Sequence, residues 1–484
     1  MQSRYQPHHA NDGRRADWVP VTPGATRSGP APAIGPPLLF SGNRGGGDRR
    51  WQYVFLTVYS TLAVVFLALG DLVFAASYLV ILLFFSLKTT DLDLFAPASL
   101  MAHAFGLYIL LPLAFNRERV GATALYIFGT LSGAILLYLA MPRLNFGQAR
   151  WLGKFGRIRE GFQRKCAAML LLGGVGFIAS TFLAGFSDPL DVFADPVKYR
   201  FFMMAKGMTY FTQLLNFLII SPPLITALAF YTGRTSRRTL WVTAFASALY
   251  GLATGSRGML VGLLLAILII RHLLRRPVSV GSVLVISCVV IPFISISGEY
   301  RMLKYEHETA AASEALTSLS VAEILNLAAS RLDASRMFNE LVIDYHGRAP
   351  HLGLSYVELP IQVIPRAFWP SKPRLPNPEM TRIIGRDDPY LDVAFDFGIF
   401  GETYINFLWT GMIAGAVIVA LFVGFMQPFF EDSKRRRSPV CVLACALFFF
   451  FPAEVVISGL AQVLVSGALS ALQVLVLRSI FFDQ

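Results

Sequence analysis

Long apolar runs separated by short polar segments are the dominant pattern of this chain of 484 residues. Most runs approach the roughly 20 mainly apolar residues that one helix needs to cross a bilayer. The pattern therefore predicts an all-α polytopic membrane protein with about twelve transmembrane helices. The predicted spans are residues 52–69, 72–87, 95–115, 122–141, 166–186, 207–231, 239–253, 258–271, 278–297, 394–428, 439–453 and 456–480.

Two polar connections are long enough to form structure outside the membrane, namely residues 187–206 and 298–393. Within the second, apolar positions of residues 320–343 recur at helical spacing and predict an amphipathic helix. Seven prolines from Pro350 to Pro378 exclude a long helix there. The chain is thus predicted to comprise a tail (1–50), helices 1–9 (51–297), a large external loop (298–393) and helices 10–12 (394–484).

Composition agrees with a membrane protein and excludes two other classes. Hydrophobic residues make up 55% of the chain and charged residues 15%, against about 25% charged residues in soluble globular proteins. This excludes a soluble enzyme and a nucleic-acid binder whose basic residues lie on a polar domain. Residues 1–50 are rich in Gly, Pro, Arg and Ser, which predicts a disordered basic tail on the cytoplasmic side.

The distribution of charge predicts the orientation of the helices. Basic residues gather in the tail and in residues 142–165, 232–238, 271–277 and 431–438. These segments hold 24 of the 42 Lys and Arg but 6 of the 30 Asp and Glu, so they carry +18 while the rest of the chain carries −6. By the positive-inside rule they are cytoplasmic, together with both termini. Residues 88–94 are the exception, because two aspartates, Asp91 and Asp93, outnumber Lys88.

A few arginines lie on the predicted outer face, against this trend. Arg257 belongs to the sequence TGSRG (254–258) between two apolar runs, where glycine allows close approach of backbone and ligand. Arg200 lies in residues 195–200, just before the sixth predicted span. Charges at a membrane edge are costly and are therefore candidates for function. The structural alternatives are an arginine that caps a hairpin, for Arg257, and contact with lipid headgroups, for Arg200.

The sequence IPRAFWPSKPR (364–374) combines cations, prolines and aromatic residues within the predicted external loop. Arg366, Lys372 and Arg374 are candidates for clamping phosphate oxygens. Trp369 offers an apolar face on which a sugar can stack. The structural alternative is a solvated charged loop that proline stiffens.

Three carboxylates surround the start of the tenth predicted span: Asp392, Asp396 and Glu402. A functional interpretation makes one of them a general base or an orienter of the arginines. The structural alternative is simple stabilisation by the positive end of a helix dipole. Lys434 lies in a predicted cytoplasmic segment, so we expect its replacement by Ala to matter little to catalysis.

The sequence supports no metal site and no cofactor. Three histidines of the external loop, His307, His346 and His351, lack metal-ligand spacing, and the chain has no HExxH motif. It also contains no P-loop, GxGxxG or GxSxG sequence. Nucleotide binding and acyl-serine chemistry therefore have no support.

The combination and order of these features resemble the Wzy-type oligosaccharide repeat-unit polymerases, which make O-antigens and exopolysaccharides. The resemblance rests on TGSRG before a helix, one large late external loop with IPRxxWPxKP, and FGxxGExYxNF (397–407) opening the next span. The related O-antigen ligases share this architecture and are the nearest alternative. A transporter of polysaccharide or lipid is the alternative outside enzymes.

The resemblance implies a GT-C-like, metal-independent membrane glycosyltransferase on the periplasmic face of a bacterial inner membrane. The donor would be an oligosaccharide on undecaprenyl diphosphate, and a chain-length regulator and a flippase would be partners besides the lipid bilayer. Arg257, with Glu402 or Asp396 as base, is then expected to be catalytic. The expected substrate-binding residues are Arg200, Arg366, Trp369, Lys372 and Arg374.

Overall fold

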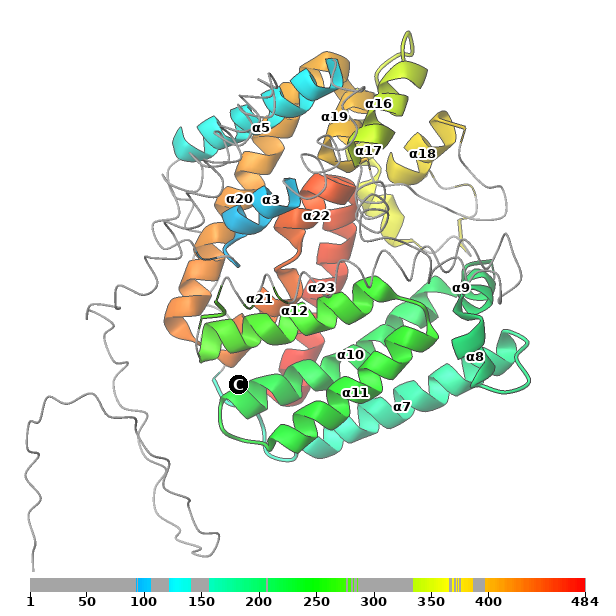
Figure 1. The fold of residues 1–484 in the computed structure, drawn as a ribbon, viewed down its shortest axis with the longest axis vertical. Coiled ribbons are helices and arrows are strands. Elements are labelled where there is room, and N and C mark those ends of the chain that lie inside the picture. The colour runs from blue at the N-terminus through cyan, green and yellow to red at the C-terminus, as the bar shows by residue number, and fades with distance from the viewer. Residues whose placement is uncertain are drawn as a thin grey trace, which may run out of the picture. The chain divides into compact units, whose positions relative to one another are not determined.

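In the computed structural model, the described part of the chain is almost entirely helical (Figure 1). Residues 1–50 form a separate unit from residues 51–484, and all that follows concerns the second unit. The described residues are 93, 95–105, 122–140, 156–205, 208–275, 277–279, 282, 285, 334–364, 368–369, 371, 373, 376–385 and 397–483.

Most helices are apolar along their length, and short breaks at glycine or polar residues separate them. In chain order they are α3 (Pro97–Phe105), α5 (Ala122–Ala140), α7 (Phe162–Leu183), α8 (Asp191–Ala194), α9 (Pro196–Ala205), α10 (Thr209–Tyr231), α11 (Arg237–Ala253), α12 (Arg257–Leu274), α16 (Ala334–Asp344), α17 (Leu354–Val357), the 3-10 helix η3 (Leu359–Val363), α18 (Pro376–Ile383), α19 (Gly398–Phe407), the 3-10 helix η4 (Leu408–Thr410), α20 (Gly411–Arg436), α21 (Pro439–Phe448), α22 (Phe451–Ser458) and α23 (Leu460–Phe481).

Five segments of the described part are long and apolar enough to cross a membrane. They are Phe162–Leu183, Tyr210–Tyr231, Gly398–Arg436, Pro439–Ser458 and Leu460–Phe481. This confirms the prediction of an all-α, multi-pass membrane protein. The first two predicted spans and most of the ninth lie outside the described residues, so the count of twelve stays a prediction.

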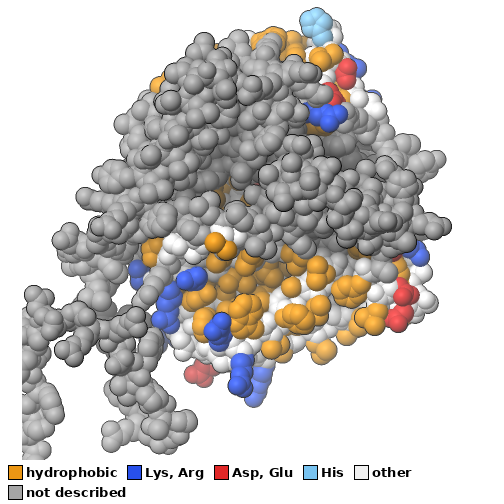
Figure 2. All heavy atoms as spheres, viewed as in Figure 1, with side chains coloured by type: hydrophobic (Ala, Val, Ile, Leu, Met, Phe, Trp, Pro, Cys, Tyr) orange, Lys and Arg blue, Asp and Glu red, His pale blue; other side chains and the backbone are white. Residues whose placement is uncertain are grey.

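Apolar side chains cover much of the outer surface of this helical unit. On α7 and α11, exposed residues include Leu171, Leu172, Val175, Trp241, Val242 and Phe245. Figure 2 shows hydrophobic side chains spread over one such face, with Lys and Arg gathered at its lower left. An apolar surface of this kind needs lipid rather than water around it.

The helices bury two main cores. One core joins α3, α5, α16, α19, α20 and α22, and the other joins α7, α10, α12, α21 and α23. Helix α16 of the predicted external loop belongs to the first core through Phe338 and Leu341, both fully buried. The loop is therefore packed against the membrane helices at this point.

Paired glycines bring α5 and α20 into close contact. Each helix carries two glycines four residues apart, Gly129 and Gly133 on α5 and Gly411 and Gly415 on α20. A Cβ added at Gly129 would overlap Met412 Sδ, and one at Gly411 would overlap the carbonyl oxygen of Thr403. Small residues at this spacing allow membrane helices to approach closely, where packing rather than the hydrophobic effect holds them together.

Basic side chains close the carbonyl ends of several helices on one face of the molecule, which we call the basic face. Arg159 Nη1 donates to the carbonyl of Ser479 (3.1 Å) and Lys165 Nζ to that of Ile480 (2.7 Å), both in the last turn of α23. Arg275 Nε donates to the carbonyl of Tyr231 (2.9 Å) at the end of α10. Cations in these places satisfy free carbonyls and complement the negative ends of the helix dipoles.

A buried ion cluster on the basic face explains the acidic exception in residues 88–94. Asp93 Oδ2 accepts hydrogen bonds from His272 Nε2 at the end of α12 (3.0 Å) and from Lys434 Nζ at the end of α20 (2.6 Å). His272 Nδ1 accepts the backbone N–H of Val278 (3.1 Å), which leaves Nε2 as the donor to Asp93. Lys434 therefore has a structural role that its position in the sequence did not indicate.

The electrostatics of Asp93 favour its charged form. Burial by itself raises the pKa of Asp93, but the hydrogen bonds from His272 and Lys434 and the charge of Lys434 outweigh burial and hold its pKa well below the ordinary range. Asp93 thus joins the start of α3 to the ends of α12 and α20 through an ionised carboxylate.

Two predicted helix boundaries were wrong. The tenth predicted span (394–428) is not one helix, because α19 ends at Phe407, where Leu408 adopts a φ of +51°, and α20 starts again at Gly411. The last two predicted spans meet at Gly459 rather than near residue 455. A hydropathy profile cannot detect these breaks, because the residues around them are as apolar as the helices.

The predicted external loop has the short helices that its prolines require. Between Pro350 and residue 385, no described helix is longer than the eight residues of α18. Helix α16 confirms the end of the predicted amphipathic helix, whereas residues 320–333 lie outside the described part.

Replacing Asp93 by Asn is expected to lower the free energy of unfolding by about 1.5–3 kcal/mol, the usual value of a hydrogen bond to a charged group. The measurement is thermal or denaturant unfolding of the purified protein in detergent. Asp432→Asn is the matched control, because Asp432 pairs with Arg436 one turn later in α20, where both side chains are partly exposed. This replacement should lower the free energy of unfolding by less than about 0.5 kcal/mol. Equal losses in the two variants would contradict a special role for Asp93.

The difference in stability between the native chain and the Asp93→Asn variant should also depend on pH. Because the pKa of Asp93 is lowered on folding, its stabilisation is complete above the unfolded-state pKa of about 3.9 and is lost as the pH falls towards the folded-state value. The stability difference between the native chain and Asp93→Asn should therefore persist at pH 5 and shrink only in stronger acid.

Candidate functional site

The turn between α11 and α12 places Arg257 at the end of the molecule away from the basic face. Gly255 adopts a φ of +61°, and the backbone N–H groups of Gly255 and Ser256 donate to Leu252 (3.0 Å) and Gly251 (2.9 Å). These two hydrogen bonds and the left-handed conformation of Gly255 end α11, and α12 begins at Arg257. The backbone of Arg257 is described, and its side chain is not.

Helix α9 lies beside this turn and carries Arg200. Tyr199 is buried in one apolar cluster with Ala253, the last residue of α11, and its hydroxyl bonds Ser180 Oγ (2.8 Å). Arg200, the next residue, is exposed. The structure therefore brings the helix of Arg200 next to the turn of Arg257, although 57 positions separate them in the chain.

The neighbouring charges of α9 are also fixed in place. Asp195 Oδ1 accepts the backbone N–H of Lys198 (3.1 Å) at the start of the helix. Lys198 Nζ lies 4.7 Å from the ring centroid of Phe186, as in a cation–π contact. Lys198 is a cation close to Arg200 that the prediction of site residues left out.

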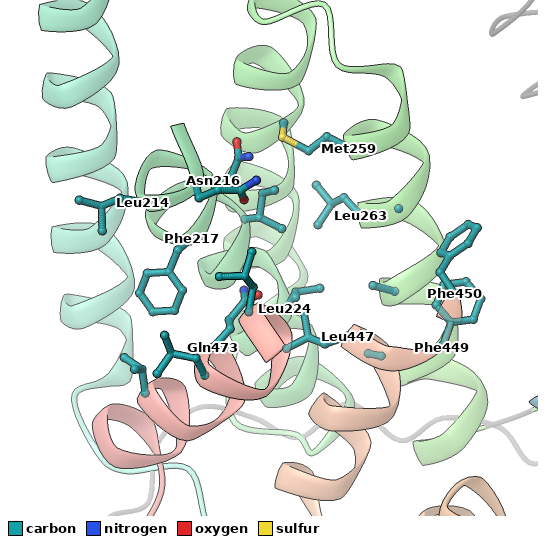
Figure 3. Close-up of a pocket in the computed structure, with 18 of the residues that line it drawn as sticks. Leu214, Asn216, Phe217, Leu224, Met259, Leu263, Leu447, Phe449, Phe450 and Gln473 are labelled. Carbon is teal, nitrogen blue, oxygen red and sulfur yellow. The ribbon is translucent and has the colours of Figure 1, made fainter. Parts of the chain in front are cut away.

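A pocket of about 600 Å³ opens between α10, α12, α21 and α23 (Figure 3). Met259, two residues after Arg257, lines it together with Leu263 and Phe217, and most of its wall is apolar. Figure 3 shows Asn216 near Met259, whereas Leu447 and Gln473 lie further along the pocket. A volume of 300–1,000 Å³ with mainly apolar walls is typical of a binding site for a small or chain-like ligand.

Three amide side chains line this pocket, Gln213, Asn216 and Gln473, and two of them have partners within the protein. Asn216 Oδ1 accepts a hydrogen bond from Tyr250 Oη (3.0 Å), and Gln473 Nε2 donates to Ser221 Oγ (3.1 Å). These bonds reduce the cost of placing amides in a membrane interior. The pocket can therefore hold an apolar chain without leaving Asn216 and Gln473 unsatisfied.

Glu402 occupies a different place from the arginines. It belongs to α19, in the first core, and only 1% of the residue is exposed. Its carboxylate accepts the backbone N–H of Ala461 (3.1 and 3.3 Å), in the first turn of α23. Glu402 thus caps a helix whose start at Gly459 has no side chain of its own to do so.

Glycines make room for this carboxylate. Gly459 has a φ of +87°, and a Cβ there would overlap Glu402 Oε2. Gly398 has a φ of +65°, and a Cβ there would overlap the carbonyl oxygen of Val456. The motif FGxxGExYxNF is therefore a packing motif in this structure, since its first glycine presses α19 against α22 and its glutamate closes the break after α22.

The last polar residue of the motif organises the external loop. Asn406 Nδ2 donates to Ser355 Oγ (2.7 Å), and its Oδ1 accepts the backbone N–H of Gly353 (3.0 Å). Asn377 of α18 likewise donates to the carbonyl of Ser458 (3.0 Å) at the end of α22. These asparagines join two parts of the loop to the helices that border it.

Tyr356 adds a buried hydroxyl that sequence reasoning missed. Within the described part, its Oη is buried and makes no hydrogen bond. Burial raises the pKa of Tyr356, and nearby Glu402 and Tyr126 raise it further, so the hydroxyl stays protonated. Periodicity could not have found it, because the short helix α17 covers only four residues.

Of the remaining predicted site residues, the structure describes only Trp369. Trp369 is 38% exposed and the adjacent Phe368 83%. Arg366, Lys372, Arg374, Asp392 and Asp396 lie outside the described residues. In the part of the chain that is described, no group of three His, Cys, Asp or Glu side chains could hold a metal ion.

Two substitutions at Glu402 separate the charge of the side chain from its hydrogen bond and packing. Glu402→Ala leaves the N–H of Ala461 unpaired beside a cavity and should lower the free energy of unfolding by roughly 2–4 kcal/mol. Glu402→Gln keeps an oxygen acceptor of the same shape and should stay within about 1 kcal/mol of the native chain. Unfolding in detergent measures both, and equal losses would show that the hydrogen bond to Ala461 is not what matters.

Comparison of the chain with protein-family models, with curated proteins and with solved structures found no match.

Proposed function

We propose that the chain is a membrane glycosyltransferase that polymerises oligosaccharide repeat units carried on undecaprenyl diphosphate. The observation that carries this proposal is that the elements of Arg257 and Arg200 are adjacent and away from the basic face, and that Met259, two residues after Arg257, lines the apolar pocket. A lipid diphosphate needs cations for its phosphates and an apolar path for its chain. Both lie within one region of the fold.

The pocket suits the lipid part of such a substrate. Its walls come from four membrane helices, and Met259 joins it to the first turn of α12, where Arg257 lies. A polyprenyl chain in the pocket would place its diphosphate near the membrane edge. This arrangement supports the assignment of Arg257 and Arg200 to the diphosphate.

In the proposed reaction, a hydroxyl of the acceptor sugar attacks the anomeric carbon of the donor sugar. The new glycosidic bond forms as the bond between that carbon and the phosphate oxygen breaks, and undecaprenyl diphosphate leaves with the bonding electrons. Negative charge grows on the phosphate oxygens, and cations already in place stabilise it. The hydroxyl proton passes to a base.

Asp396 and Glu402 remain the proposed bases, and the surroundings of Glu402 restrict how it could act. Because its carboxylate already accepts the N–H of Ala461, it can take a proton only if the substrate reaches the start of α23. A Glu402→Gln protein that is folded and fully active would assign the base to another residue. Arg366, Lys372, Arg374 and Trp369 are proposed to hold the sugars and phosphates from the loop.

The proposed setting is the periplasmic face of a bacterial inner membrane, with both termini cytoplasmic. The basic face, with the ends of α10 and α23, would then be cytoplasmic. A chain-length regulator and a flippase would act in the same process, and no metal ion or cofactor is expected to be needed.

Arg257→Ala is expected to keep the fold and to lower polymer formation at least about 100-fold, the usual effect of removing one charge-stabilising donor. The assay follows the length of lipid-linked oligosaccharide with purified protein in liposomes containing a chelator. Arg238→Ala, at the basic-face end of α11, is the matched control and should polymerise normally.

The same assay distinguishes the other functions. Normal polymer length in the Arg257→Ala protein would remove Arg257 from the site. Transfer of one complete glycan to a different lipid or protein acceptor would indicate a ligase. Movement of the substrate across the liposome membrane without elongation would indicate a transporter.

Gly262→Phe is expected to fill the pocket and to raise the KM for lipid-linked substrate about tenfold, equivalent to about 1.4 kcal/mol. Gly262 lines the pocket, and a Cβ there meets no atom within 4 Å, so the fold should tolerate the ring. Gly174→Phe is the matched control, because Gly174 is equally open but lines a separate cavity of about 190 Å³. Equal effects on KM would exclude a specific role for the larger pocket.

A further inference from the structure

Residues 351–357, which we call the 351–357 segment, have an inverted distribution of polar and apolar side chains. Leu352, Leu354 and Val357 point away from the protein and are 77%, 54% and 73% exposed. Ser355, in contrast, is buried, and its Oγ accepts a hydrogen bond from Asn406 Nδ2. A short helix at a water-facing surface has the opposite arrangement, with apolar residues inward.

The backbone of the 351–357 segment is held in a conformation that displays these side chains. Three successive N–H groups bind the end of α19: His351 donates to the carbonyl of Ile405 (3.0 Å), Leu352 to that of Asn406 (2.9 Å) and Gly353 to Asn406 Oδ1 (3.0 Å). Leu352 adopts a φ of +49°, which is strained for a residue with a Cβ. Such strain persists only where the surroundings impose it, and it often marks a functional position.

The 351–357 segment lies where two membrane-spanning helices begin. Its anchor, Asn406, is five residues before the start of α20 at Gly411, and Trp409 between them is 45% exposed. The 3-10 helix η3, which follows the segment, packs against α23. Exposed tryptophan at the end of a span is typical of the boundary between lipid headgroups and acyl chains.

We propose that the 351–357 segment is seated in the lipid bilayer, at the boundary of headgroups and acyl chains on the face opposite the basic face. Leu352, Leu354 and Val357 contact lipid there, and α23, against which η3 packs, exposes apolar Leu464 near its start. Further along the same loop, Phe368 and Trp369 present exposed aromatic rings of the kind found at this boundary.

Lipid is the occupant that the observations favour over water or a protein. Water would leave three large apolar side chains exposed within six residues, while polar Ser355 is turned inward. The segment is bound next to the start of α20, and η3 after it packs against α23, so lipid around these spans can cover it. The loop is thereby tied to the membrane edge, whatever reaction the protein performs.

Site-directed spin labelling tests the proposal on the full chain in liposomes. Leu354→Cys and Val357→Cys, each in a background whose four native cysteines are replaced by Ala, carry a nitroxide. Power-saturation EPR then compares collision with oxygen, which concentrates in lipid, and with a nickel chelate, which stays in water. Both positions are exposed, so the label should not disturb the fold, and monodisperse elution checks this.

Two positions of the same chain calibrate the result. Leu464→Cys reports the exposed outer part of α23, and Arg348→Cys reports an exposed polar position four residues after the end of α16. The proposal expects the ratio of oxygen to nickel accessibility at 354 and 357 to match Leu464→Cys and to exceed Arg348→Cys. A ratio equal to that of Arg348→Cys would overturn it in favour of water. Low access of both reagents would overturn it in favour of a protein partner or a second copy of the chain.

Discussion

The constraint on which the rest of this structure depends is that the backbone groups of a broken helix need a hydrogen-bond partner in the protein wherever water cannot reach them. The chain breaks its helices at Leu408, within the apolar segment Gly398–Arg436, and at Gly459, between the segments Pro439–Ser458 and Leu460–Phe481. Each break exposes backbone groups that must find a partner in the protein. The carboxylate of Glu402 does this for Ala461, and glycine at 459 is the residue that leaves space for it.

The organisation of the external loop follows from the same constraint. Because α19 is short and ends at Phe407, its last turn is free to accept the N–H groups of His351 and Leu352 and to present Asn406 to Gly353. The loop is therefore anchored at the membrane edge rather than forming a separate domain there. On the basic face, Arg159, Lys165 and Asp93 have the corresponding role, since they close helix ends or join them. Several charged side chains of the described part thus complete backbone hydrogen bonds, whereas Arg200 of α9 is exposed.

Sequence reasoning succeeded where a local signal is strong. The turn before Arg257 follows from TGSRG between two apolar runs, and the short helices after Pro350 follow from the prolines. It failed where the partner is distant in the chain. Asp93 looked like an exception to the charge pattern because Lys434, its partner, lies 341 positions away. Glu402 looked like a carboxylate at an outer helix start, whereas its position against Ala461 depends on how α19 crosses α22 and α23.

By itself, the sequence determined that this is a multi-pass helical membrane protein, and it predicted which face is basic. Both properties are sums over single residues, since transfer of each side chain to lipid and attraction of each cation to one side add up along a segment. Only the tertiary structure decided where the apolar pocket lies, that α9 meets the α11–α12 turn, and that Ser355 turns inward while Leu354 and Val357 turn outward. These depend on contacts between residues far apart in the chain, and in a close-packed interior the shape of every neighbour decides such contacts.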